Sequence, residues 1–292
     1  RQNRRSTLNI RMLARTFSTI LLWAATLLAI IYFAAYGWAV IVALLSAAAL
    51  HEVFEVQRKI GFKPSETFGQ IASIAIFLCV WIDSELAISG GFGGSLAFAL
   101  SLTAISCCVL KHPYSEFFKE TTLPTICAIS TVPFMLQWLV VLGFADFGLS
   151  KYTGVILSIW ILAAAKFSDV GAYVLGSAFG RHKMAPSISP KKTWEGAVGG
   201  LFSSAAVSAA IACGFADSLP AQFTPPIAAV TGILIGAVAI LSDLLESVFK
   251  RVAGVKDSGS LIPGIGGALD LADSLLLSAP LGTVLLIFIL QL

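Results

Sequence analysis

Two aspartates, Asp270 and Asp273, stand three residues apart just before the last apolar stretch of the chain, in the sequence IPGIGGALDLADSLL. Upstream, polar residues recur at i, i+3, i+4 and i+7, namely Asp243, Glu246, Ser247 and Lys250. On a helix these four side chains share one face. The intervening DSGSLIPGIGG is rich in Gly and Pro and predicts a turn. We therefore expect the chain to fold back and bring Asp243 against Asp270 and Asp273.

Three clustered carboxylates repel one another unless something neutralises them. One candidate is a hard divalent cation, because Mg²⁺ takes oxygen ligands and is often shared with substrate phosphates. The other is direct pairing with a nearby cation, for which the sequence offers Lys250, Arg251 and Lys256. That second arrangement would be only a salt-bridged helix end. The pattern does not suit zinc, because no Cys lies nearby and the three His residues are widely scattered.

A second polar stretch, residues 166–196, is rich in basic side chains, which are Arg181, His182, Lys183, Lys191 and Lys192. Ser189 and Thr193 add hydroxyl groups, and Thr193 predicts the start of a helix. Such a segment can bind anionic oxygens through its side chains and through helix N–H groups. The alternative is a cytoplasmic loop whose charge serves only orientation. Within the same stretch, Asp169 is expected to pair with Lys166, three residues earlier.

The elements that carry these residues are predicted to be membrane helices. The chain is 57% hydrophobic and 12% charged, with a mean hydropathy of +0.89, whereas soluble domains carry about 25% charged residues. We predict an all-α, polytopic integral membrane protein with about nine transmembrane helices. A cytoplasmic N-terminal segment, 1–16, would precede a single membrane domain, 17–292, with catalytic motifs at 166–200 and 242–274. The predicted spans are roughly 17–35, 37–53, 68–82, 92–110, 123–143, 152–168, 197–215, 226–249 and 274–291.

The basic residues agree with this count. Of the 19 Lys and Arg residues, all except Lys151 and Lys166 fall at the N-terminus or in loops on one side of the predicted bilayer. The positive-inside rule then places the N-terminus and both polar stretches in the cytoplasm and the C-terminus outside. The net charge of +3 thus reflects topology, and we expect no nucleic-acid partner. The five cysteines lie in apolar stretches without metal-ligand spacing and are expected to be packing residues.

Candidate cation ligands, a basic anion-binding segment and a membrane face together favour phosphate chemistry on a lipid. The sequence contains neither the P-loop pattern GxxxxGK[ST] nor the nucleophile pattern GxSxG, which argues against P-loop nucleotide hydrolysis and against acyl transfer.

The residues of both stretches resemble those of the integral-membrane phosphatidate cytidylyltransferases, also called CDP-diacylglycerol synthases. The upstream SDVGAY…FGRHK…ISPKKTWEG is similar to one landmark of that family. The positions that fit its signature without a gap are Ser247, Lys250, Arg251, Lys256, Asp257, Gly259, Ile262, Pro263, Gly266, Gly267, Asp270 and Asp273. Two positions depart, since Ile265 replaces a signature His and Leu271 replaces a signature Arg. Roles that depend on those two side chains are therefore in doubt.

The resemblance implies that CTP and phosphatidate react to give CDP-diacylglycerol and pyrophosphate in phospholipid biosynthesis. It implies Mg²⁺ at two divalent sites, with room for a monovalent ion, held by Asp243, Asp270 and Asp273. Catalysis would involve these aspartates together with Lys250 and Ser247. Substrate would be bound by Lys191, Lys192, Arg251, Lys256, Asp169 and Glu195. The resemblance also implies a homodimer in the cell inner (plasma) membrane, with its active site facing the cytoplasm.

Three other functions remain open from the sequence. A CTP-dependent transferase could act on another lipid, such as a polyprenol. A lipid transporter or scramblase would move lipid without nucleotide turnover, but it should have polar groups along a path across the bilayer, whereas here they gather at one face. A non-catalytic scaffold would account for the substitutions at Ile265 and Leu271.

Overall fold

The computed structural model describes residues 24–86, 91–111, 115–255, 258–259 and 266–290 of the chain. The predicted N-terminal segment, 1–16, lies outside these residues. The described residues are almost entirely helical, which confirms the predicted all-α class. Seven helices are long and apolar enough to cross a membrane, and two shorter apolar helices, Ala24–Phe33 and Gly93–Cys108, occupy the remaining predicted positions. The chain is a multi-pass membrane protein.

The first half of the chain forms one group of helices. These are α2 (Ala35–Ile60), α3 (Glu66–Leu86), α4 (Gly93–Lys111), the short α5 (Ser115–Phe117) with the π-helical turn Phe118–Thr122, α6 (Leu123–Thr131) and α7 (Pro133–Phe144). The predicted span 123–143 is divided between α6 and α7. The break falls at Val132, because the proline at position 133 disfavours helical geometry in the residue before it.

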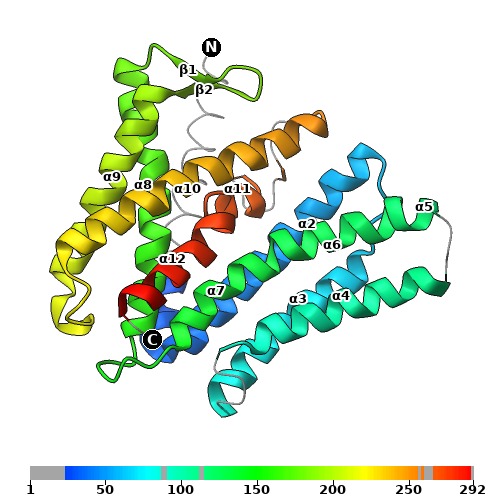
Figure 1. The fold of residues 1–292 in the computed structure, drawn as a ribbon, viewed down its shortest axis with the longest axis horizontal. Helices are drawn as coiled ribbons and strands as arrows, with labels where there is room; N and C mark the ends of the chain where they lie inside the picture. The colour runs from blue at the N-terminus through cyan, green and yellow to red at the C-terminus, as the bar shows by residue number, and fades with distance from the viewer. Residues whose placement is uncertain (1–23, 87–90, 112–114, 256–257, 260–265, 291–292) are drawn as a thin grey trace, which may run out of the picture.

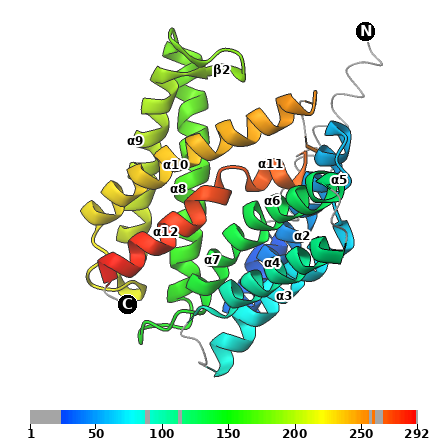
Figure 2. The ribbon, with the colours of Figure 1, turned by 45° about the vertical axis from the view of Figure 1, so that its right-hand side comes forward.

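The second half contains α8 (Thr153–Phe179), β1 (Lys183–Ala185), β2 (Ser189–Thr193), α9 (Trp194–Gly214), the 3₁₀ turn Ala216–Ser218, α10 (Pro225–Val252), α11 (Ala268–Ala272) and α12 (Leu275–Leu290). In Figure 1 the hairpin of β1 and β2 lies at one end of the molecule, and the α7–α8 and α9–α10 connections lie at the other. The figure also shows α10 crossing α8 and α9, with α12 beside it. Figure 2 shows the same arrangement after a turn of the molecule.

Two features of this half differ from the sequence predictions. The span predicted to end at 168 continues as α8 to Phe179, since no proline or other strong break interrupts it. Lys166 and Asp169 therefore lie within a helix and not at its end. The antiparallel hairpin was not predicted. Residues 183–193 contain Pro186 and Pro190, which prevent a continuous helix there and leave a short hairpin as the local structure.

Small residues allow α8, α9 and α10 to pack closely. A Cβ on Gly200 of α9 would lie 2.7 Å from the backbone oxygen of Ser168 on α8. Buried hydroxyls join the same three helices, because Ser204 Oγ donates to Ala164 O (2.9 Å) and to Gly232 O (2.6 Å). This three-helix unit carries the basic hairpin at one end. It also positions the part of α10 that contains Asp243 and Glu246.

Candidate active site

Three carboxylates from two regions of the chain meet beside the C-terminal part of α10. Asp243 and Glu246 lie one turn apart on α10, and Asp273 lies between α11 and α12. One oxygen from each lies within 4.8 Å of the others. The sequence predicted that Asp243 and Asp273 meet, and the structure brings them together. Glu246 completes this group, although the sequence analysis placed it on the correct helix face without assigning it as a ligand.

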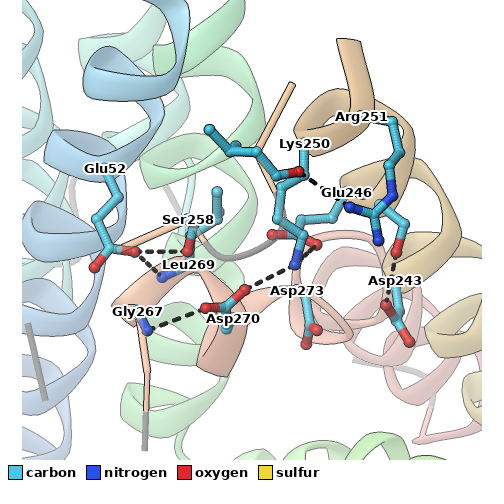
Figure 3. A network of polar contacts seen from close by, with 12 residues as sticks. Glu52, Asp243, Glu246, Lys250, Arg251, Ser258, Gly267, Leu269, Asp270 and Asp273 are labelled. Carbon is cyan, nitrogen blue, oxygen red and sulfur yellow. Dashed lines mark hydrogen bonds and ion pairs between the residues drawn. The ribbon is translucent and has the colours of Figure 1, made fainter. Parts of the chain in front are cut away.

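Asp270, the third predicted ligand, lies on α11 beside this group. Its Oδ1 accepts from Lys250 Nζ at 2.8 Å, and its Oδ2 accepts from the backbone N–H of Gly267 at 3.0 Å. The same ammonium group lies 2.6 Å from Glu246. Lys250 therefore joins Asp270 to the carboxylate group, as Figure 3 shows.

Each of the other two carboxylates also contacts a lysine. Lys192 Nζ, from β2, lies 2.5 Å from Asp243, and Lys166 Nζ, from α8, lies 3.0 Å from Asp273. Lys166 was expected to pair with Asp169, and that expectation is wrong: its ion pair in the described structure is with Asp273. The reason is the return of the chain after α11, which places Asp273 within reach of α8. All four of these side chains are less than a third exposed, so their attraction is only partly screened by water.

A cleft of about 190 Å³ adjoins Asp243 and unites the two polar stretches. Its polar lining comes from α8, β2 and α10, and consists of Asp169, Tyr173, Lys191, Lys192, Thr193 and Asp243. Lys191 is exposed, whereas the end of Lys192 is directed to Asp243. The cleft therefore combines cations that can bind phosphate with carboxylate oxygens that can bind a hard cation.

The hairpin is fixed by its own polar contacts. Thr193 caps α9, as predicted, by accepting from the backbone N–H of Gly196 at 3.1 Å. Glu195 accepts from the backbone N–H groups of Arg181 and His182 and contacts His182 Nδ1 at 2.5 Å. This candidate for substrate binding thus holds the hairpin to the start of α9.

Two further predicted residues, Ser247 and Arg251, lie on the last turns of α10. Ser247 Oγ is 3.5 Å from Asp243 Oδ1, at the edge of hydrogen-bond range. Arg251 donates to the backbone oxygens of Ile188 and Val255, so it ties the hairpin to α10. Lys256 and Ile265 lie outside the described residues. Leu271 is half-buried within α11.

Sequence reasoning missed Glu52 of α2. Its side chain is buried and accepts hydrogen bonds from the loop that precedes α11 and from α11 itself. The sequence contained one signal, because Glu52 is an acid inside a predicted span, where an ionisable residue is costly without a partner.

Comparison with known proteins identifies the family of the chain. The family model described as "Cytidylyltransferase family" matches residues 13–289. The chain belongs to the cytidylyltransferase family. Several relatives are named phosphatidate cytidylyltransferase. That of Haemophilus influenzae is 33% identical over 94% of this chain and 99% of its own. That of Mycobacterium bovis is 32% identical over 87% of this chain and 81% of its own. That of Staphylococcus aureus (strain COL) is 36% identical over 64% of this chain and 68% of its own.

The donor set at the centre fits the Mg²⁺ that the sequence resemblance led us to expect. Asp243, Glu246 and Asp273 offer only oxygens, and Mg²⁺ prefers oxygen ligands and retains some of its water. In the structure each of the three carboxylates also contacts a lysine, so a bound cation would share these oxygens with Lys192, Lys250 and Lys166. Among the described residues, no His or Cys belongs to this group, which argues against zinc.

Proposed function

We propose that this chain is a phosphatidate cytidylyltransferase, which converts CTP and phosphatidate into CDP-diacylglycerol and pyrophosphate in phospholipid biosynthesis. The observation that carries the proposal is the cleft in which Asp243 of α10 meets Lys192 of β2, at one end of a bundle of membrane helices. A water-soluble triphosphate and a membrane lipid can both approach such a position. The names of the relatives support the same activity.

In the proposed reaction, a phosphate oxygen of phosphatidate forms a bond to the α-phosphorus of CTP. The bond between that phosphorus and the oxygen of the leaving pyrophosphate breaks. The attacking phosphate is already an anion near neutral pH, so the site needs no strong general base. Catalysis instead depends on positioning two anions and on stabilising their charge.

Lysines around the centre perform much of this task. Lys192 lines the cleft and contacts Asp243, so it is placed to bind a phosphate there. Lys166 and Lys250 contact Asp273 and Asp270 beside the cleft and would balance charge at the centre. Lys191, exposed in the cleft, would hold a phosphate, and Arg251 and Lys256 would steady the triphosphate or the departing pyrophosphate. Ser247 would donate a hydrogen bond, and Asp169 would contact substrate from the cleft wall.

Asp243, Glu246 and Asp273 would hold one Mg²⁺. Asp270 would serve the second divalent site, and a monovalent ion could share the remaining oxygens. Bound there, Mg²⁺ would supply Lewis-acid stabilisation of charge on the phosphoryl oxygens. Asp270 is oriented for such a role by Lys250 and by the N–H of Gly267.

We further propose that the protein is a homodimer in the cell inner membrane, with the N-terminus and the site in the cytoplasm. The basic loops support this orientation, because Lys and Arg accumulate on the cytoplasmic side. The homodimer rests on the family resemblance alone and can be tested by measuring the mass of the purified protein in detergent.

The function is tested with purified protein in lipid–detergent micelles, radiolabelled CTP and separate lipid acceptors. We expect label to enter phosphatidate, with release of one pyrophosphate per product. Label entering only a polyprenol acceptor would instead show a CTP-dependent transferase for another lipid. Lipid movement across vesicles without CTP turnover would show a transporter. The absence of both CTP turnover and lipid movement would favour a non-catalytic scaffold.

A further inference from the structure

A buried carboxylate from α2 lies beside the start of α11, the short helix that carries Asp270. Glu52 of α2 is only 2% exposed, and among the described residues no cation forms an ion pair with it. A buried carboxylate is costly unless hydrogen bonds replace its water. Glu52 receives three such bonds, from Ser258 Oγ (3.0 Å), Ala268 N (2.9 Å) and Leu269 N (2.9 Å). Figure 3 shows the side chain directed at this segment, which is distant in sequence.

Two glycines make room for this carboxylate. A Cβ on Gly259 would lie 2.4 Å from Glu52 Oε1, and a Cβ on Gly267 would lie 2.4 Å from Oε2. Gly267 has φ −79°, a value that any residue adopts, so it is required for space and not for backbone conformation. Both positions belong to the signature described above, and Glu52 gives a physical reason for a glycine at each.

The contacts of Glu52 determine how α11 is held. The N–H of Gly267 donates to Asp270, and the next two N–H groups, of Ala268 and Leu269, donate to Glu52. Carboxylates thus satisfy three leading donors of a five-residue helix, which is too short to be stable by itself. Both oxygens of Glu52 are needed, because Oε1 serves Ala268 and Oε2 serves Leu269 and Ser258.

We propose that Glu52 is a positioning residue for the site. It holds Ser258 and the first residues of α11 so that Asp270 meets Lys250 and Asp273 meets Asp243 and Glu246. Glu52 acts through these aspartates and contacts no substrate. The kinetic part of its test rests on the proposed function, whereas the structural part does not.

The structural test is amide hydrogen exchange on the purified protein in detergent. Glu52→Gln keeps the side-chain size but presents an NH₂ group where an acceptor is needed. We expect exchange in peptides covering 266–272 to accelerate by about tenfold, while peptides of α10 are unchanged. Ser258→Ala, which loses one bond of three, should accelerate the same peptides by about threefold. Glu55→Gln removes the same charge from an exposed position one turn away on α2 and serves as the control.

The kinetic test separates positioning from general stability. In Glu52→Gln we expect kcat per folded protein to fall by at least about tenfold, with KM for CTP changed by less than about threefold. Gly267→Ala should reproduce the fall in kcat per folded protein without changing any charge, because its Cβ would lie 2.4 Å from Glu52 Oε2.

Unchanged exchange at 266–272, or acceleration spread evenly over the protein, would overturn the proposal. Activity lost only in proportion to the amount of folded protein would also overturn it. If the wild type does not use CTP, the proposed function fails, and the exchange result still decides the role of Glu52.

Discussion

At the scale of single residues, the site balances acids against lysines. Asp243, Asp273 and Asp270 each contact an ammonium group, supplied by Lys192, Lys166 and Lys250. Replacing one residue of such a pair leaves the charge of the other partly buried and unpaired. The free energy lost is then larger than the net stabilisation that the intact pair provides. Substitutions here should therefore affect both charge balance and geometry, and the neutral isosteres Asn and Gln are the most informative changes.

Asp243→Asn is expected to lower kcat on the order of 100-fold, because the change removes a proposed cation ligand and the partner of Lys192. The measurement is label transfer from CTP to phosphatidate by purified protein, normalised to folded protein. Asp217→Asn, an exposed change in the α9–α10 connection, should leave the rate unaltered. Near wild-type turnover in Asp243→Asn would contradict its role in the site.

Glu246→Gln tests the ligand that the sequence analysis did not assign. We expect the Mg²⁺ concentration for half-maximal activity to rise by about tenfold, and binding of Mn²⁺, followed by electron paramagnetic resonance, to weaken by a similar factor. Glu116→Gln, an exposed change, is the control. If Glu246→Gln binds Mn²⁺ normally while Asp270→Asn does not, then the predicted set of Asp243, Asp270 and Asp273 is the ligand group.

At the scale of elements, the site depends on how closely α8, α9 and α10 approach. Gly200 faces the backbone of Ser168, and Ser204 donates to backbone oxygens on both neighbouring helices. Lys166 and Asp243 lie on two of these helices, and α9 follows directly from the strand that carries Lys192. A small increase in helix separation would therefore pull the lysines from the carboxylates. Membrane helices obtain stability here from packing and hydrogen bonds, since lipid offers no hydrophobic driving force between them.

Gly200→Ala is expected to destabilise this unit by about 1–3 kcal/mol, because the new methyl group would lie 2.7 Å from a backbone oxygen that cannot rotate away. Gly214→Ala, on the same helix, meets no atom within 4 Å and provides the matched control. Unfolding in detergent, followed by circular dichroism, measures the difference. Equal stability of the two variants would show that the close helix contact is not required.

At the scale of the whole molecule, the sequence predicted most of the architecture but not all the contacts. Long apolar stretches determine membrane helices. The expectation that the chain returns and brings Asp273 to Asp243 is confirmed, although most of residues 257–267 lie outside the described residues. Three features depend on tertiary packing and left little sequence pattern. They are the pairing of Lys166 with Asp273, the short hairpin, and the reach of Glu52 to a segment about 200 residues later. Periodicity reports which face of an element is polar, but not which distant element that face meets.

The orientation of the molecule yields the last prediction. One crossing of the membrane by α9 separates the hairpin from the α9–α10 connection, so Ser187 and Asp217 should face opposite compartments. In a variant without native cysteines, we expect Asp217→Cys to react with a membrane-impermeant maleimide in intact cells. Ser187→Cys should react only after the membrane is opened. Both positions are exposed in the fold, so a failure to react reports the compartment and not burial. Labelling of Ser187→Cys from outside would place the site away from cytoplasmic CTP and would contradict the proposed orientation, even if the purified enzyme were active.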